Sequence, residues 1–362
     1  MSRNRTPYFD CARVLAIISI SLNHAVNRPF DNAIDTQAEF QAMTWGVQCI
    51  KAVVSVFSRL GVPIFIMLTG ALFLSRSFKT ESEVIHFYRH NWLRLLVAVE
   101  IWLAIYFWFI FFAALRELSH EDLILSFVST LLFINQQTEP LMWYMGMIIP
   151  LYTLIPVLSV FINKGYFKYL RLPVLFAFFV PVIAYDYQRH LSMTYPEESF
   201  VTALQSPISF FVGIVIVGYY ISNGGLSKIP TVLICAINLG LFTAATRYQL
   251  WLYASPYNTL VAYDSVLLLL CSFTVFELIR RADGKIMHFF SNALAHLSKR
   301  CLGLYFVHII IMEWICWHFD FSNISPLEKM LILESFSLGG ALIVVELLGV
   351  IKPVKKYLFI IK

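Results

Sequence analysis

The chain has 362 residues, of which 59% are hydrophobic and only 14% are charged. Soluble domains carry about 25% charged residues, so these proportions exclude a soluble globular protein and indicate one that lies within a membrane. The formal net charge of +5 does not indicate a nucleic acid partner, because the basic residues collect on one side of the predicted helices.

Ten segments are apolar over roughly the 20 residues that a helix needs to cross the hydrocarbon core. They are 8–27, 46–75, 92–114, 141–162, 169–185, 206–222, 230–246, 257–278, 301–319 and 330–351. Gly61 and Pro63 predict a kink in the long second segment. Residues 123–134 are apolar but short, which favours an interfacial or re-entrant piece. The sequence therefore predicts an all-α, polytopic helix bundle with about ten transmembrane helices, forming one membrane-embedded domain over residues 1–362.

The distribution of Lys and Arg predicts the orientation of this bundle. An even number of spans puts both termini on one side, and most of the basic residues then fall on that side. Cytoplasmic loops carry the excess of Lys and Arg, so both termini are predicted to be cytoplasmic. The first span lacks a small-residue cleavage site, which indicates a retained helix rather than a signal peptide.

The six cysteines do not suggest a metal or disulfide framework. All lie in or beside apolar stretches, and none forms a C-x-x-C pair. We therefore expect small packing residues and no zinc site.

The first helix, YFDCARVLAIISISLNHAVN over residues 8–27, carries ionisable side chains. Arg13 and His24 are eleven residues apart, which is about three helical turns and about 16 Å, so they share one face. Intramembrane ionisable residues usually mark a functional path. The alternative is that Arg13 pairs with Asp10 and only anchors the helix, and that His24 is a neutral, hydrogen-bonded imidazole near the outer surface. The common face favours a site.

The pattern D-x-x-R followed by ten residues and His resembles the membrane-bound acyltransferase-3 family, whose first helix carries an R-x10-H signature. Here the matching residues are Asp10, Arg13 and His24. The resemblance implies a cell-surface polysaccharide O-acyltransferase type of protein.

Three further segments are similar to family landmarks and follow in the same order. GVPIFIMLTGALFL (61–74) resembles the second-helix segment, which usually ends in Ser-Gly, and Thr69 keeps the hydroxyl. MWYMGMIIPLYTLIPVL (142–158) resembles the fourth span, and LGLYFVH (302–308) the late Gly-aromatic-His segment. The basic stretch YRHNWLRLLV departs from the family, because Asn91 and Val97 stand where Arg and Pro are expected.

The resemblance implies an O-acetyltransferase in the bacterial cytoplasmic (inner) membrane. It would move an acyl group, usually acetyl, from cytoplasmic acyl-CoA to a hydroxyl of a cell-envelope glycan or its lipid-linked precursor. Acetyl-CoA would be a donor substrate rather than a bound cofactor, and the partners would be the glycan acceptor and membrane lipids. The alternatives are a transporter or flippase, and a non-catalytic subunit of a polysaccharide export system.

The residues of the first helix suit that chemistry. A histidine that titrates near pH 6.5 is a natural general base for a sugar hydroxyl, and His24 takes that role. A covalent acyl-imidazole on His24 is the second possibility. Arg13 either holds an oxygen of CoA or polarises the thioester carbonyl as charge develops.

The phosphates of CoA need cations, and the predicted cytoplasmic rim supplies six: Arg76, Lys79, Arg89, Arg94, Lys299 and Arg300. Arg76, Arg89 and Arg94 are the predicted ligands. The alternative is that each is only a topology determinant. Arg94 is the favoured ligand, because it opens the third span and matches the family stretch.

Several other polar residues in the spans are supporting candidates. Asp10 and Thr69 match the family, and Arg59 needs a carboxylate, for which Glu100, Asp264 and Glu313 are available.

Two aromatic pairs have open roles. Tyr305 and His308 are three residues apart and share a helical face, so His308 is either a supporting residue or a buried, hydrogen-bonded histidine. Trp143 and Tyr144 form either a stacking wall for sugar or adenine, or part of an interfacial aromatic belt.

Overall fold

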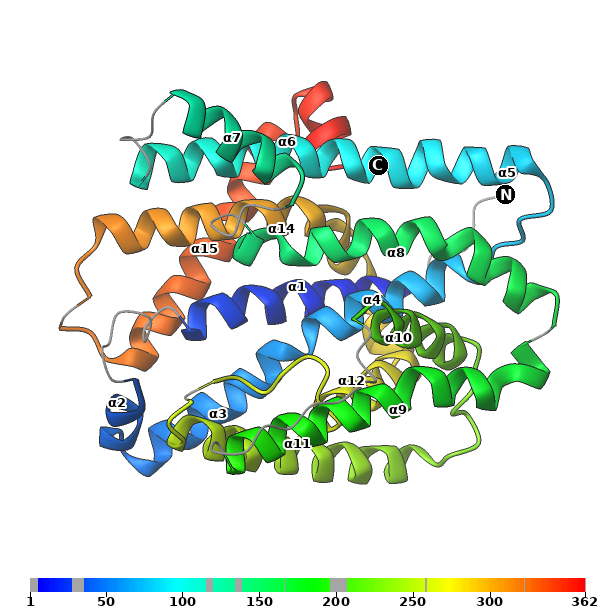
Figure 1. The fold of residues 1–362 in the computed structure, drawn as a ribbon, viewed down its shortest axis with the longest axis horizontal. Helices are drawn as coiled ribbons and strands as arrows, with labels where there is room; N and C mark the ends of the chain where they lie inside the picture. The colour runs from blue at the N-terminus through cyan, green and yellow to red at the C-terminus, as the bar shows by residue number, and fades with distance from the viewer. Residues whose placement is uncertain are drawn as a thin grey trace. The chain divides into compact units, whose positions relative to one another are not determined.

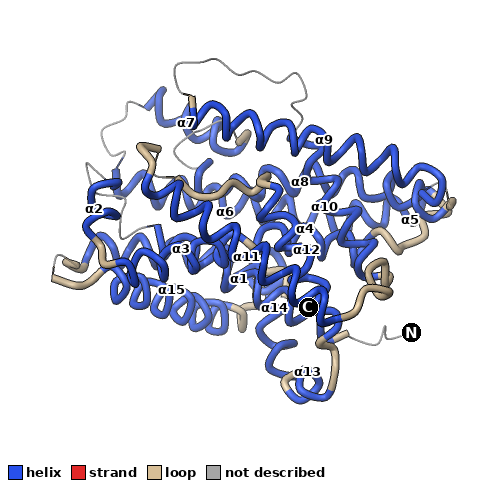
Figure 2. The backbone as a smooth tube through the Cα atoms, turned by 90° about the horizontal axis from the view of Figure 1, so that it is seen from below, coloured by secondary structure: helices blue, strands red, loops and turns tan. Residues whose placement is uncertain are grey.

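The computed structural model describes residues 6–27, 36–114, 120–133, 139–165, 167–195, 207–257, 259–321 and 323–361. Every regular element in these ranges is helical (Figures 1 and 2). The all-α prediction is therefore confirmed for the described residues.

The helices follow one another without an intervening strand in the described ranges. They are α1 (Pro7–Asn27), α2 (Thr36–Ala42), α3 (Trp45–Arg59), α4 (Gly61–Phe73), α5 (Glu81–Phe87), the π-helix η2 (Tyr88–Trp92), α6 (Leu93–Ala114), α7 (His120–Leu131), α8 (Glu139–Asn163), α9 (Phe167–Thr194), α10 (Pro207–Ser222), α11 (Thr231–Ala254), α12 (Val266–Arg281), α13 (Lys285–Phe289), α14 (Ser291–His318), α15 (Pro326–Leu348) and the π-helix η3 (Val354–Leu358).

Seven helical segments among the described residues are long and apolar enough to cross a membrane. They are Pro7–Asn27, Trp45–Phe73, Glu81–Phe111, Met142–Asn163, Thr231–Ala254, Ser291–His318 and Pro326–Leu348. This supports a multi-pass membrane protein, but the predicted count of ten is not confirmed. The other three predicted spans correspond to α9, of 28 residues, and to α10 and α12, of 16 residues each. The cytoplasmic location of the termini stays a prediction.

The predicted kink in the second span is a break between two helices. The α3 helix ends at Arg59 and α4 begins at Gly61. The amide of Leu60 donates to the carbonyl of Phe57 at 3.1 Å, a tighter turn than that of an α-helix. Pro63 has no amide hydrogen to return to the carbonyl four residues earlier, so the chain cannot continue a regular helix through this point.

The short apolar stretch predicted at 123–134 falls on α7. This helix has 12 residues, which gives about 18 Å at 1.5 Å per residue. It is too short to cross the roughly 30 Å hydrocarbon core. Its interfacial or re-entrant placement stays a prediction.

The chain packs as two compact units. Unit 1 comprises Met1–Ser77, Leu158–Ser298 and Ser322–Ile332, and unit 2 comprises Phe78–Val157, Lys299–Phe321 and Leu333–Lys362. The prediction of one membrane-embedded domain over residues 1–362 stays untested.

Within unit 1, α4 and α10 touch backbone to backbone through two glycines. A Cβ atom on Gly70 would lie 1.8 Å from the carbonyl oxygen of Val215, and one on Gly218 would lie 2.1 Å from that of Met67. Small residues allow such close approach where helices meet in a membrane. The position of Thr69, next to Gly70, is fixed by this contact.

Candidate functional site

Arg13 is held by two side chains in unit 1. One of its terminal nitrogens donates to Oδ1 of Asp10 at 3.1 Å and to Oγ of Ser298 at 3.1 Å. Asp10 is buried, at 3% exposure, whereas the Arg13 side chain keeps 28% of its surface. The Asp10–Arg13 pair weighed in the sequence is therefore present, and Ser298 on α14 adds a partner that the sequence did not indicate.

His24 lies on the same helix as Arg13. The α1 helix runs unbroken from Pro7 to Asn27, so about three turns separate the two side chains and they project on the same side. Both side chains are half-buried. Part of each side chain is therefore left uncovered by the packing of the helices.

The Ser19 side chain connects α1 to the break between α3 and α4. The hydroxyl of Ser19 donates to the carbonyls of Phe57 and Ser58, at 2.8 and 3.0 Å. These carbonyls belong to the last turn of α3, where helical partners are missing. A Cβ atom on Gly61 would lie 2.5 Å from the carbonyl oxygen of Ala16. The turns of α1 between Arg13 and His24 thus pack closely against the junction of α3 and α4.

Beside His24, a buried polar chain leads from α1 to α11. The Ser58 hydroxyl donates to the carbonyl of Ser55 at 2.7 Å and lies 3.4 Å from Oδ1 of Asn23. The hydroxyls of Ser55 and Tyr253 lie 2.7 Å apart. Buried polar groups that are hydrogen-bonded in this way give a helix interface one defined arrangement.

Lys51, which lies within the predicted span 46–75, is buried in unit 1. Its ammonium lies 4.2 Å from the ring centroid of Tyr253 and 5.4 Å from that of Phe40. Aromatic faces attract a desolvated cation. The two rings therefore stabilise a charge that hydrocarbon alone would disfavour.

Within unit 1, Arg59 does not pair with a carboxylate of the kind that the sequence suggested. Its Nε donates to the carbonyl of Val261 at 3.0 Å, and its guanidinium lies 3.6 Å from the ring centroid of Tyr263. Asp264, one of the three proposed partners, instead accepts two hydrogen bonds of 2.7 Å from Arg189. Of the three candidates left open, Asp264 is therefore not the partner of Arg59: an aromatic face and a carbonyl satisfy Arg59, while the planar fork of Arg189 matches the carboxylate.

Two further predicted residues lie near the end of α4. The hydroxyl of Thr69 donates to the carbonyl of Phe65 at 3.2 Å within its own helix, and Thr69 is 5% exposed. The Arg76 guanidinium lies 4.5 Å from the ring centroid of Phe73. Asn163 donates to the Arg76 carbonyl at 2.8 Å, so the backbone that carries this cation is fixed.

In unit 2, the predicted phosphate ligands Arg89 and Arg94 lie on either side of the end of η2. The α5 helix begins with a capping box between Thr80 and Glu83. Arg89 is exposed and Arg94 is half-buried. The terminal nitrogen Nη2 of Arg94 donates to the carbonyl of Lys356 at 3.4 Å.

Tyr305 and His308 share a helical face of α14, as the sequence predicted. Their ring centroids lie 6.1 Å apart, and both side chains are buried, at 5% and 0% exposure. Nδ1 of His308 donates to the carbonyl of Leu304 at 2.9 Å. Tyr144 packs against Tyr305 with 5.8 Å between the centroids, so this ring belongs to the interior of unit 2.

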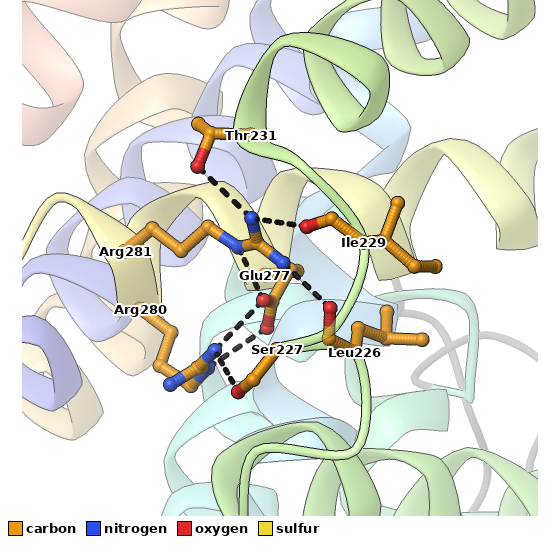
Figure 3. Close-up of polar contacts among 7 residues, drawn as sticks. All are labelled: Leu226, Ser227, Ile229, Thr231, Glu277, Arg280 and Arg281. Carbon is orange, nitrogen blue, oxygen red and sulfur yellow. Dashed lines mark hydrogen bonds and ion pairs between the residues drawn. The ribbon is translucent and has the colours of Figure 1, made fainter.

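The sequence missed a buried carboxylate in unit 1 with two arginine partners, shown in Figure 3. Glu277 is fully buried. It accepts hydrogen bonds of 2.8 Å from Nε and Nη2 of Arg280 and one of 2.5 Å from Nε of Arg281. Arg280 and Arg281 lie three and four residues after Glu277 on α12, the spacings at which helical side chains meet. In the sequence the two arginines count only as determinants of topology, and this signal was therefore missed.

Arg281 extends this cluster to the turn before α11. It donates to the carbonyls of Leu226 and Ile229 at 2.6 and 2.8 Å and to the hydroxyl of Thr231 at 2.9 Å. Figure 3 shows both guanidinium groups around the Glu277 carboxylate. The cluster therefore joins the end of α12 to the start of α11.

The Glu277→Ala substitution should destabilise the protein. It leaves two guanidinium groups without their carboxylate, which for fully buried pairs costs roughly 3–5 kcal/mol. Because 21% and 14% of the two arginine side chains stay exposed, we expect about 2 kcal/mol. Thermal unfolding of the purified protein in detergent measures this loss of stability. The control Glu81→Ala removes an exposed carboxylate and should change stability by about 0.5 kcal/mol or less; equal melting temperatures for the two variants would contradict the expectation.

The predicted site residues thus fall into two sets. Asp10, Arg13, His24, Arg59, Thr69 and Arg76 belong to unit 1, and Arg89, Arg94, Tyr305 and His308 belong to unit 2. Within the sets, the structure brings Arg13 to Asp10 and Tyr305 to His308. Among the described residues there is no group of three or more His, Cys, Asp or Glu side chains placed to hold a metal ion.

Comparison with known proteins gives one family. A family model described as an acyltransferase domain matches residues 6–349. Neither the curated proteins nor the solved structures contain a match. The matched range includes α1 through α15.

Proposed function

The chain belongs to the acyltransferase-3 family, and on that premise we propose that this membrane acyltransferase transfers an acetyl group from acetyl-CoA to a hydroxyl of a cell-envelope glycan or its lipid-linked precursor. The observation that carries the proposal is the arrangement of side chains on α1. This helix holds a half-buried histidine and a half-buried arginine on one face, and the arginine is fixed by Asp10 and Ser298.

His24 is the proposed group that activates the acceptor. A sugar hydroxyl is a weak nucleophile at neutral pH, and a neutral imidazole removes its proton as the oxygen attacks the thioester carbonyl. The carbon–sulfur bond then breaks, and the CoA thiolate takes a proton as it leaves. In the alternative route, the imidazole nitrogen attacks first and carries the acetyl group to the hydroxyl.

Arg13 is proposed to hold the donor or the developing charge. An arginine has five N–H donors, and Asp10 and Ser298 both bind to the same terminal nitrogen of Arg13. The exposed part of the guanidinium is therefore available for a CoA oxygen or for the thioester carbonyl oxygen. The fixed geometry lowers the reorganisation needed when that charge forms.

The remaining assignments follow the same premise. The protein is proposed to lie in the bacterial cytoplasmic membrane with both termini cytoplasmic. Arg76, Arg89 and Arg94 would bind the phosphates of CoA there, and Arg59, Thr69, Tyr305 and His308 would support the site. The family assignment favours an enzyme over the alternatives of a transporter, a flippase or a non-catalytic subunit of an export system.

The test is direct acyl transfer. Membranes containing the protein, and matched membranes without it, receive radiolabelled acetyl-CoA, and label is followed into glycan and lipid-linked fractions. Label that depends on the protein identifies both the reaction and the acceptor fraction. Label that is equal in both membranes would reject acetyl-CoA as the donor. Longer acyl-CoA donors in the same assay then test the acyl specificity.

Loss of the Ser298 hydroxyl should weaken catalysis through Arg13. The Ser298→Ala substitution removes one of the two side chains that hold the guanidinium, and a hydrogen bond to a charged group contributes about 1.5 kcal/mol. We expect kcat/KM for acetyl-CoA to fall by roughly tenfold. Ser298→Thr keeps the hydroxyl and should retain most of the activity. If both variants lose activity equally, the hydroxyl does not act on Arg13.

A further inference from the structure

The chain beyond the family match ends in a segment that is anchored in unit 2. The match stops at residue 349, and η3 covers Val354–Leu358. Nε1 of Trp102 on α6 donates to the carbonyl of Leu358 at 3.1 Å. The Phe359 ring is fully buried and lies 6.1 Å, between centroids, from Trp102. The residues of η3 therefore have fixed positions against α6.

This anchoring brings the backbone of η3 to Arg94. Nη2 of Arg94 lies 3.4 Å from the carbonyl of Lys356, at the long end of the hydrogen-bond range. Nε of Arg94 is buried without a hydrogen-bond acceptor among the described residues. A buried, charged donor left without an acceptor is unfavourable, so this guanidinium has hydrogen-bonding capacity that the described residues do not fill.

Two residues of η3 at this contact, Lys356 and Tyr357, have exposed side chains. The ammonium of Lys356 lies 4.7 Å from the ring centroid of Tyr357. The Lys356 ammonium, as a hydrogen-bond donor, and then the Arg94 guanidinium lower the pKa of the Tyr357 phenol below its usual range. In the described part of the chain, no carboxylate forms an ion pair with Arg94 or Lys356. The three groups together present donors and positive charge to solvent.

We propose that Arg94, Lys356 and Tyr357 form a binding site for a phosphate-bearing group. Arginine offers a planar fork of donors, lysine a compact charge and the phenol a third donor, a combination suited to several oxygens of one phosphate. Two sources supply such a group: the phosphates of CoA and the headgroup of an anionic lipid. The CoA source rests on the proposed function, whereas the lipid source does not.

The experiment uses full-length protein in lipid nanodiscs and two ligands. In the first arm, radiolabelled CoA is titrated onto protein in phosphatidylcholine nanodiscs. In the second, the melting temperature without CoA is compared between discs with and without phosphatidylglycerol. The variants are Lys356→Gln, Lys356→Arg and Tyr357→Phe. The control Lys352→Gln removes an exposed charge of the same segment, one that makes no contact with Arg94 in the structure.

For a CoA site, Lys356→Gln should weaken CoA binding by roughly tenfold and Tyr357→Phe by roughly threefold. For a lipid site, Lys356→Gln should remove the stabilisation by phosphatidylglycerol and leave CoA binding unchanged. In either case Lys356→Arg and Lys352→Gln should stay within about twofold of the wild type. The proposal is overturned if Lys356→Gln changes neither arm, or if Lys352→Gln has the same effect as Lys356→Gln.

The outcome can be separated from that of the proposed function. Acyl transfer that requires His24, together with unchanged CoA and lipid responses in Lys356→Gln, would refute this site alone. Absence of acyl transfer, together with a lipid response that Lys356→Gln abolishes, would refute the proposed function alone.

Discussion

Membranes that contain the His24→Ala variant should transfer almost no acetyl label to the acceptor fraction that the wild type labels. General base catalysis contributes roughly 10²–10⁴-fold, and a histidine that carries the acyl group contributes at least as much. The side chain is only half-buried, and Ala16 and Ser19 hold α1 against the junction of α3 and α4. The fold should therefore survive while the rate falls.

The matched control is His190→Ala. His190 belongs to the same unit as His24 but is exposed, on α9, and it should keep wild-type transfer. Both variants are compared at equal abundance, with melting temperatures measured alongside. Transfer by His24→Ala at the wild-type rate would show that His24 is not catalytic.

The same preparation separates the two roles of His24. If the imidazole carries the acetyl group, protein incubated with labelled acetyl-CoA and no acceptor should retain label, and His24→Ala should not. If the imidazole acts as a base, no such label forms, although transfer to the acceptor still requires His24. Only the carrier route gives a labelled protein.

The sequence predicted local features well. The register of Arg13 and His24 on one face needs only the helical repeat, and α1 is continuous through both residues. The break near Gly61 and Pro63 follows from the missing proline amide, and α3 and α4 meet there. In both cases the cause lies within one or two turns of the chain, where sequence spacing determines geometry.

Contacts between distant segments could not be predicted in this way. Ser298 is 285 residues from Arg13, and no spacing rule selects one serine among many. Asp264 was available to Arg59 and to Arg189, and only the packing of α9 against the segment before α12 decides in favour of Arg189. The choice depends on tertiary positions that a single sequence does not contain.

The predicted span count is not confirmed, and α12 shows a related reason. Residues 257–278 are apolar and predict one span, but α12 begins at Val266. Its start is fixed by Asp186 on α9, which accepts a hydrogen bond from the Val266 amide at 3.0 Å. This carboxylate serves as an N-terminal cap supplied by another helix. Hydropathy shows where a segment is apolar, but not where a distant side chain ends the helix.

The Gly70→Ala substitution should destabilise unit 1 more than any other small change on α4. An added Cβ would lie 1.8 Å from the carbonyl oxygen of Val215 and 2.7 Å from its carbonyl carbon. These are backbone atoms, so no side-chain rotation relieves the clash, and α4 and α10 must separate. Overpacking costs about 1–3 kcal/mol, and occasionally more. We expect the upper end, and a melting temperature lower by roughly 5 °C or more.

Gly240→Ala is the control for this experiment. Gly240 is exposed in the middle of α11, and a Cβ there would meet nothing within 4 Å. Because alanine favours a helix over glycine by roughly 0.5–1 kcal/mol, this variant should be as stable as the wild type or slightly more. Gly218→Ala, with its Cβ 2.1 Å from the Met67 carbonyl, should behave like Gly70→Ala. Equal melting temperatures for Gly70→Ala and Gly240→Ala would contradict the close α4–α10 contact. That contact also explains why the Thr69–Gly70 pair, which the sequence related to a family landmark, requires glycine at its second position.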